Sequence, residues 1–416
     1  MFSVDYRDRR VTVMGLGRFG GGVGAVRFLV ERGAIVTVTD SASADDLAES
    51  LAELEGLALC GLHLGGHRED DFLDADLIVV NPAVKRDNEF LHLAQDAGVP
   101  LTSEMSLFFQ HNPARTIGVT GSNGKSTTAA LIHSILQAAG MPSRLGGNIG
   151  GSLLPEVDTI AADEWIVLEL SSFQLEDLDR LPASPDVAVV TNFSPNHLDW
   201  HGSLDDYRKA KQAILRWQTP DGIAVLNAAD ADVAEWGVHG QRFVFGEITE
   251  EASRGRQPSD DQPADADRSP DDMLHVDECL ALPGDHNRDN ALAAVCACRA
   301  IGVSGDAIRA GLRAFKPLPH RLEFVGEVAG RRFYNDSLAT TPESALAALT
   351  AFDAPVVLLA GGYDKQVDLS SLVDGITQGV KSVALMGQTA LLLDEMLDER
   401  GGRSVSRSIN KSFDGA

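Results

Sequence analysis

The stretch TIGVTGSNGKSTTAALIHSILQAA, residues 116–139, decides the fold class of this chain. An apolar run at 116–120 leads directly into a glycine-containing loop, and residues 125–139 then have the pattern of a helix. Strand, loop and helix in this order predict one unit of a parallel sheet with a helical crossover. Similar alternation fills most of the sequence, so we expect an α/β protein.

The same patterns predict three domains. Expected strands lie at residues 11–14, 35–39, 77–80, 116–120, 165–170, 187–191, 223–226, 333–334, 356–360 and 382–386, and expected helices at 24–32, 88–97, 125–139, 204–216 and 288–301. Breaks near residues 110–113 and 315–319 separate the units. We therefore predict a Rossmann-like domain at 1–112, a central P-loop ATPase-like parallel sheet at 113–317 and a Rossmann-like domain at 318–416.

Charge narrows the range of partners. The 416 residues include 35 Lys and Arg against 61 Asp and Glu, a formal charge of −26. Such a balance disfavours nucleic acid and anionic membranes, whereas a small anionic substrate needs only a few local cations. No stretch has the length and apolarity of a membrane span. Residues 247–272, rich in acids, Ser and Pro, are expected to form an acidic loop without a core.

The cysteines suggest a reducing compartment. Cys60, Cys279, Cys296 and Cys298 are too few and too scattered for a disulfide framework, and buried thiols are a better interpretation than a metal site. The N-terminus has no signal sequence, so we expect a cytoplasmic protein.

The loop at residues 121–127 is the strongest chemical signal. Its glycines allow close backbone approach, the following helix offers free N–H groups, Lys125 supplies a positive charge and Ser126 a hydroxyl for Mg²⁺. These features predict a phosphate-binding loop, although Val119 stands where the strict motif has its first glycine. The residues expected to bind ATP here are Gly121, Ser122, Asn123, Gly124, Lys125, Ser126 and Thr127.

Two polar residues follow strands of the same predicted sheet. Glu169 ends the strand at 165–170, and His197 follows the strand at 187–191, so both belong to the carboxyl edge where α/β sheets bind ligands. Alone, Glu169 could be an ion-paired strand end and His197 an ordinary loop residue. Together with the phosphate loop they are candidate Mg²⁺ ligands.

A second glycine loop lies near the N-terminus. Gly15 and Gly17 follow the first strand, and Asp40 ends the next one, in the pattern of a dinucleotide-binding fingerprint. This pattern alone supports a nicotinamide dehydrogenase as an alternative. That hypothesis leaves Lys125 and its loop unexplained.

Nine motifs in order resemble the Mur ligases across essentially the whole chain. They are GVTGSNGKST (118–127), GGNIG (146–150), LELSSFQLE (168–176), NHLD (196–199), YRKAK (207–211), PGDHNRDNALAA (283–294), LPHRLE (318–323), NDSLAT (335–340) and GGYDK (361–365). LELSSFQLE is especially close to the branch that adds D-glutamate. The resemblance implies ATP-dependent amide formation through an acyl phosphate, with UDP-N-acetylmuramoyl-L-alanine and glutamate as substrates.

The resemblance also assigns roles to residues. It implies that Gly15, Gly17 and Asp40 contact uridine or pyrophosphate, and that Lys125, His197 and Lys211 are catalytic. ATP would use two Mg²⁺ ions, held by Ser126, Glu169, His197 and a carbamylated Lys211. Without the family, Lys211 would be interpreted as a solvated helix residue. Further implied contacts are Asn148, Thr340 and Lys365 with substrate, and Asn287, Asn290, Arg321 and Asp336 with the nucleotide.

Some of these assignments have simpler structural alternatives. Asn287 and Asn290 could cap the following helix, and Arg321 with Asp336 could form a structural ion pair. Leu338 stands where many family members have a lysine, which keeps a ligase for L-glutamate as an alternative. The chain ends at Ala416, before the family's last strand and the segment that holds D-glutamate, so we expect weakened or absent activity for this chain. A non-catalytic nucleotide-sugar binding protein is another alternative, and a monomer is expected.

Overall fold

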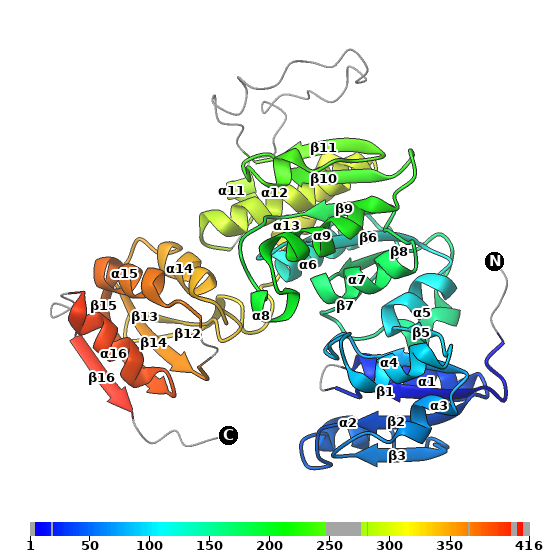
Figure 1. Ribbon diagram of the computed structural model, residues 1–416. Helices are drawn as coiled ribbons and strands as arrows, with labels where there is room; N and C mark the ends of the chain where they lie inside the picture. Colours follow the sequence, from blue (N-terminus) through cyan, green and yellow to red (C-terminus); the bar gives the residue numbers. More distant parts are fainter. Residues whose placement is uncertain are drawn as a thin grey trace. The chain divides into compact units, whose positions relative to one another are not determined.

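The structure is a computed structural model that describes residues 5–17, 20–246, 276–280, 282–364, 367–400 and 406–410. It divides into two compact units, one of Met1–Leu274 with Asn290–Ala314 and the other of His275–Asp289 with Phe315–Ala416. Both units contain parallel strands and helices, which confirms the predicted α/β class (Figure 1). The predicted acidic loop at 247–272 lies outside the described residues.

The first sheet has the strand order β3-β2-β1-β4-β5, and all its pairs are parallel. Its strands are β1 (Arg10–Met14), β2 (Ile35–Asp40), β3 (Gly61–Leu64), β4 (Leu77–Val80) and β5 (Leu101–Thr102). Its helices are α1 (Gly21–Glu31), α2 (Ala48–Ala52), α3 (Glu69–Leu73), α4 (Glu89–Asp96) and α5 (Glu104–His111). Because β1 has β2 on one side and β4 on the other, the loop after β1 opens at the point where strand order reverses, where such sheets bind ligands.

The central sheet has the order β11-β10-β9-β6-β8-β7 and is also entirely parallel. Its strands are β6 (Arg115–Thr120), β7 (Ser143–Gly147), β8 (Trp165–Glu169), β9 (Val187–Val190), β10 (Ile223–Asn227) and β11 (Gln241–Phe245). Its helices are α6 (Lys125–Ala138), η1 (Leu154–Thr159), α7 (Ser172–Arg180), α8 (Leu198–His201), α9 (Leu204–Arg216), η2 (Val233–Glu235), α12 (Asp285–Ala300) and α13 (Gly305–Ala314).

Helices cover both faces of the central sheet, as right-handed crossovers require. Helix α6 packs against α13 and the strands beside it, and α7 packs against α9 (Figure 1). Strand β6 is buried along almost its whole length and lies between β8 and β9. The loop that follows β6 therefore starts from a buried strand with a neighbouring strand on each side.

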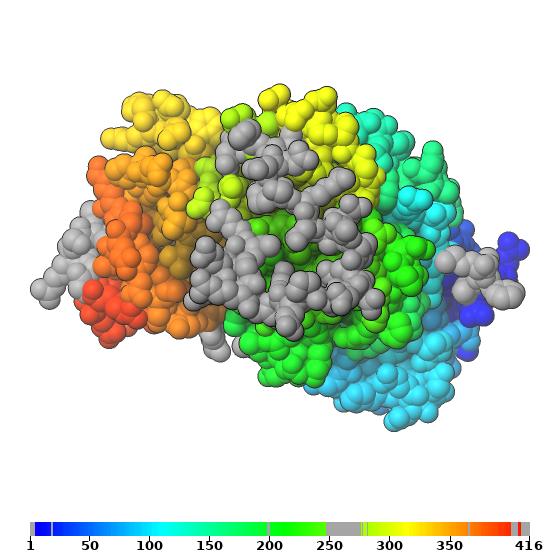
Figure 2. Space-filling model, turned by 90° about the horizontal axis from the view of Figure 1, so that it is seen from above, coloured from blue at the N-terminus to red at the C-terminus, as the bar shows by residue number. Residues whose placement is uncertain are grey.

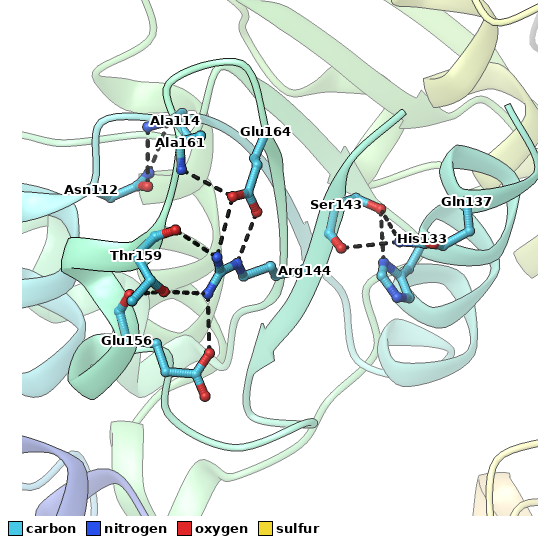
Figure 3. A network of polar contacts seen from close by, with 10 residues as sticks. All are labelled: Asn112, Ala114, His133, Gln137, Ser143, Arg144, Glu156, Thr159, Ala161 and Glu164. Atoms are coloured by element: carbon cyan, nitrogen blue, oxygen red, sulfur yellow. Dashed lines mark hydrogen bonds and ion pairs between the residues drawn. The ribbon is translucent and has the colours of Figure 1, made fainter. Parts of the chain in front are cut away.

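One edge of the central sheet is fastened by Arg144 on β7 (Figure 3). Its guanidinium bonds Glu164 at 2.8 Å through Nε, the carbonyl of Thr159 at 2.8 Å and Glu156 at 3.1 Å. These contacts tie η1 and the turn before β8 to β7. Nearby, His133 on α6 bonds the Ser143 hydroxyl at 3.1 Å (Figure 3).

The second unit contains a hairpin and a three-stranded parallel sheet. Its strands are β12 (Glu323–Val328), β13 (Arg331–Asn335), β14 (Val356–Gly362), β15 (Val380–Gly387) and β16 (Ser406–Asn410). Its helices are α11 (Val276–Cys279), α14 (Pro342–Thr350), α15 (Ser370–Gly379) and α16 (Ala390–Glu399). The core lies between α15, α16 and the parallel sheet, and the orange and red atoms of Figure 2 show one face of these elements. The antiparallel hairpin β12–β13 was not predicted.

Two buried carboxylates connect the part of the chain around the first sheet with the part around the central sheet. Glu104, at the start of α5, accepts a hydrogen bond from the Ser152 hydroxyl, and Asp177 of α7 pairs with Arg86. Burial raises the pKa of Glu104 to about 7. Within the part of the chain that the structure describes, no helix has the length and apolarity needed to cross a membrane.

Candidate functional site

The first glycine loop closes around a carboxylate. Asp40, at the end of β2, is 7% exposed, and its Oδ2 accepts hydrogen bonds from the backbone N–H of Leu16 at 2.8 Å and of Gly17 at 3.4 Å. Asn81, after β4, packs so close to Gly15 and Gly17 that a Cβ on either would lie 2.8 Å from it. The structure thus brings the three predicted residues together, and it adds Asn81, whose only sequence signal is its place at a strand end.

The second glycine loop closes around the amines of two lysines. Lys125 Nζ donates to the carbonyls of Gly121 and Ser122, both at 3.0 Å. Lys211 Nζ, which comes from α9, donates to the same Gly121 carbonyl at 2.7 Å and is 2% exposed. Burial, and then the charge of Lys125, lower the pKa of Lys211 well below its usual range, while Glu169 opposes the shift. A site for anions with two close lysines fits polyphosphate chemistry.

Glu169 lies at the end of β8 beside the two lysines. Its Oε1 accepts a hydrogen bond from Asn148 Nδ2 at 3.2 Å, and its backbone carbonyl accepts one from the Asn148 N–H at 2.9 Å. The other carboxylate oxygen, Oε2, is buried and has no hydrogen-bond partner among the described residues. A buried carboxylate oxygen in this state is costly unless a ligand satisfies it.

Side chains after β9 hold the middle of the second loop, a contact that the sequence did not reveal. The Asn123 carbonyl accepts from Thr191 Oγ1 at 2.6 Å and Asn192 Nδ2 at 3.1 Å, and Asn192 Oδ1 accepts from the Asn123 N–H at 2.8 Å. Asn290 on α12 packs against Gly124, where a Cβ would lie 2.0 Å from its Oδ1. The only available signal was that Thr191 and Asn192 follow a buried strand.

His197 is exposed and lies among aromatic rings. Its ring is 5.3 Å from that of Phe173 and 6.3 Å from that of Tyr207, and its backbone φ is +52°. The Tyr207 hydroxyl is 3.3 Å from Ser122 Oγ, and burial raises its pKa to about 12. Its ring also lies 4.8 Å from Lys211 Nζ. Phe173 and Tyr207 lie within the motifs LELSSFQLE and YRKAK, but no role was predicted for either ring.

The other predicted residues belong to α12 and the second unit. Asn287 lies inside α12 and donates through Nδ2 to the Pro283 carbonyl at 2.7 Å, so it supports the start of the helix without capping it, because a capping side chain accepts from a backbone N–H. Asp336 accepts from the Leu322 N–H at 2.9 Å. Burial raises the pKa of Asp336, and the nearby Arg321 opposes that shift. Thr340 and Leu338 are exposed, and Lys365 lies outside the described residues.

The four predicted metal ligands are side chains of four different residue types. Within the described ranges, no cluster of three or more His, Cys, Asp or Glu side chains could hold a metal ion. The predicted set contains only Glu169 and His197 of these types, besides the hydroxyl of Ser126 and the amine of Lys211. Ser126 and Thr127 lie in the first turn of α6 and are 7% and 8% exposed. Any metal here would therefore need ligands from a bound substrate or a modified side chain.

Comparisons with known proteins agree with this arrangement. The family described as Mur ligase middle domain matches residues 119–298, and the one described as Mur ligase MurD-like, N-terminal domain matches residues 9–103. A UDP-N-acetylmuramoylalanine--D-glutamate ligase from Roseiflexus sp. (strain RS-1) is 40% identical, covering 92% of this chain and 84% of the relative. The enzyme of that name from Symbiobacterium thermophilum is 39% identical, covering 95% and 86%.

Solved structures share the fold at lower identity. UDP-N-acetylmuramate-alanine ligase from Thermotoga maritima is 18% identical with a TM-score of 0.61, covering 97% of this chain and 91% of that one. MurF from Acinetobacter baumannii is 18% identical with a TM-score of 0.56, covering 96% and 83%. At this identity the likeness concerns the fold alone.

Proposed function

The chain belongs to the Mur ligase family, and we propose that it uses ATP to join D-glutamate to UDP-N-acetylmuramoyl-L-alanine in peptidoglycan precursor synthesis. Relatives that are 35–40% identical over most of the chain carry the name of this D-glutamate ligase. The reaction forms an amide bond, and the enzymes that catalyse it are ATP-dependent ligases.

One observation supports the site assignment above all others. Lys125 and Lys211, from helices far apart in the sequence, converge on the carbonyl of Gly121, with Glu169 close enough to act on the pKa of Lys211. The first step joins two anions, because a substrate carboxylate must attack the γ-phosphorus of ATP. Positive charge held at the phosphate loop offsets that repulsion.

Mg²⁺ fits the residues on this edge of the sheet. The buried Oε2 of Glu169, which has no hydrogen-bond partner among the described residues, is the oxygen donor that Mg²⁺ prefers, and Ser126 would add a hydroxyl. His197 would serve a second ion. When bound, Mg²⁺ would neutralise the phosphates and align them for in-line attack.

Lys211 is suited to carbamylation. Its burial and its lysine neighbour favour the neutral amine, which is the form that attacks CO₂ to give a carbamate and release one proton. The product carries a negative charge and two oxygens, so it would place an anionic oxygen ligand beside a metal where the amine offers none. Carbamylation would thus change the charge of this side chain from neutral to negative.

The remaining residues would orient the substrates. Asn148, hydrogen-bonded to Glu169, would contact the substrate near the reacting carboxylate, and Asn290 beside Gly124 would face the nucleotide. Gly15, Gly17 and Asp40 would contact the UDP portion. The carboxylate would form an acyl phosphate and ADP, and the glutamate amine would then displace phosphate.

Residues of the second unit are proposed to contact the nucleotide and the substrate as well. Arg321 and Asp336 would reach the nucleotide, Asn287 would face its adenine, and Thr340 and Lys365 would contact substrate. A cytoplasmic location and a monomer also remain predictions.

Phosphate release tests the proposal directly. Release should require ATP, UDP-N-acetylmuramoyl-L-alanine and D-glutamate together, and L-glutamate in a parallel reaction should give far less. Comparable release with L-glutamate would favour the ligase alternative raised by Leu338. Tight NADH binding without ATP binding would instead favour a dehydrogenase, and nucleotide-sugar binding without release by the natural full-length protein would favour a binding protein.

A further inference from the structure

His201, at the end of α8, contacts two residues of α7 through its side chain. Its Nε2 lies 2.9 Å from Ser172 Oγ and its Nδ1 lies 3.0 Å from Glu176 Oε1, while its side chain is 1% exposed. The Glu176 carboxylate can only accept, so Nδ1 carries the proton in the neutral ring and Nε2 accepts from the serine. Both ring nitrogens therefore have partners.

This Ser–His–Glu arrangement has the order of a hydrolase triad but cannot act as one. Ser172 is 3% exposed and is the first residue of α7, and the ring of His201 is fully enclosed. A nucleophile must reach the substrate carbon. The three residues therefore have a structural function. They hold together the segments of the chain from which they come.

Aromatic contacts extend the connection. The Phe173 ring stacks parallel to the His201 ring, with an angle of 2° and 5.3 Å between centroids, and Tyr207 lies 5.2 Å away. Phe173 also meets the His197 ring edge-on at 5.3 Å. The imidazole of His201 thus lies between α7 and α9 and supports the ring that contacts His197.

Each neighbour of His201 lies close in the chain to a proposed metal ligand. Ser172 follows Glu169 by three residues, and Tyr207 precedes Lys211 by one helical turn. The backbone N–H of His201 donates to the carbonyl of His197 at 3.0 Å. The buried side chain of His201 therefore connects α7 with α9, and its backbone joins the segment of His197 to them.

We infer that His201 is a positioning residue that holds Glu169, His197 and Lys211 in register for the metal ions of the reaction. The inference rests on the proposed function, since it assumes that these residues bind metal. Residues that orient metal ligands from outside typically change metal affinity 10- to 100-fold when they are replaced. His197 depends on such support because its own side chain is exposed.

The test uses Mn²⁺ as the probe, with ADP, and follows its binding to the full chain by electron paramagnetic resonance. His201→Phe keeps a flat ring against Phe173 but removes both side-chain hydrogen bonds, so Mn²⁺ should bind about 10-fold more weakly. His201→Gln can keep the contact with Ser172 and should restore part of the affinity. His133→Phe, which removes the comparable His–Ser hydrogen bond to Ser143 (Figure 3), is the matched control and should bind Mn²⁺ like the unmodified protein.

A second readout separates positioning from general damage. In the ligase reaction, His201→Phe should raise the Mg²⁺ concentration needed for half-maximal rate, with a smaller fall in the rate at saturating Mg²⁺. Ser172→Ala, which removes one hydroxyl, serves if His201→Phe does not fold. Unchanged Mn²⁺ affinity in the folded His201→Phe protein, or in Ser172→Ala in its place, would overturn the inference. If the unmodified protein with ADP binds no Mn²⁺, the proposed metal site itself is wrong and the inference falls with it.

Discussion

Two glycine loops occupy equivalent places in the two parallel sheets of the first unit, yet a carboxylate closes one and lysine amines close the other. The loop after β1 turns its N–H groups onto the carboxylate of Asp40, whereas the loop after β6 turns carbonyls onto Lys125 and Lys211. A loop whose amides already bind a protein carboxylate offers fewer donors to a phosphate. The comparison teaches that a glycine motif gives the backbone shape, while the charge placed in it decides which ligand it suits.

Among the variants that test the charge difference between the two glycine loops, the largest effect is expected at Lys125. Lys125→Met should lower the rate of ATP-dependent ligation by about 10²- to 10³-fold, since it removes a cation from the phosphates in the transition state. Steady-state phosphate release measures the effect. Lys209→Met, which changes an exposed lysine on α9, is the control and should leave the rate within a few-fold. Similar losses in both variants would argue against a specific role.

The contact between the two sheets should respond to pH. Burial raises the pKa of Glu104 from 4.5 to about 7, so the protonated carboxyl stabilises the folded chain below pH 4.5 and this stability is lost as pH rises through 7. Glu104→Gln cannot ionise. Relative to this variant, the unmodified protein should lose up to about 3 kcal/mol of unfolding free energy between pH 4.5 and pH 8.

Urea unfolding at several pH values measures this loss. A constant difference between the two proteins across the range would contradict a raised pKa for Glu104. Glu156→Gln, at an exposed carboxylate that contacts Arg144, is the control for a general effect of charge removal.

The glycines just before α1 and α6 allow the packing around the two loops to be compared. Gly20 and Gly124 have nearly the same backbone angles, φ 81° and 82°, so alanine at either position meets the same strain of about 1 kcal/mol. Among the described residues a Cβ at Gly20 meets nothing within 4 Å, whereas one at Gly124 would lie 2.0 Å from Asn290 Oδ1. Gly124→Ala should therefore destabilise the chain by about 2 kcal/mol more than Gly20→Ala in urea unfolding. Equal losses would mean that Asn290 moves aside freely.

The smallest effect is expected at Asp40. Asp40→Asn keeps the shape but places an amide where Oδ2 now accepts from Leu16 and Gly17, which should cost about 1 kcal/mol of unfolding free energy. Thermal unfolding measures it. Asp45→Asn is a surface control, since Asp45 is exposed. A stabilised Asp40→Asn protein would show that the carboxylate is not the acceptor that closes this loop.

The sequence predicted the fold best where the periodicity is strong. The strand at 77–80 and the helix at 204–216 agree with the structure residue for residue, because a buried apolar run and a clear amphipathic pattern define them. Strand β7 was not predicted, since Ser143–Gly147 carries an arginine and two glycines and lies at a sheet edge. Its stability comes from pairing with β8, which local sequence does not record.

The candidate site was predictable only where chemistry follows a strand directly. Lys125 and Glu169 were found from the residues alone, since each lies at a strand end in a recognisable local pattern. Lys211 came from the family resemblance, because on α9 it has the sequence pattern of a solvated residue, and only tertiary packing buries it. His201 and Tyr207 were missed since their contacts join segments far apart in the chain.

The central claim is that the loop after β6 binds ATP and the loop after β1 binds the nucleotide sugar. Equilibrium dialysis tests it most directly, by measuring the affinities of Lys125→Met and Asp40→Asn for ATP and for UDP-N-acetylmuramoyl-L-alanine. The charge difference predicts that Lys125→Met binds ATP at least about 10-fold more weakly and keeps its affinity for the nucleotide sugar, while Asp40→Asn changes only the latter. Unchanged ATP affinity in Lys125→Met, or a parallel loss of both ligands in either folded variant, would contradict it.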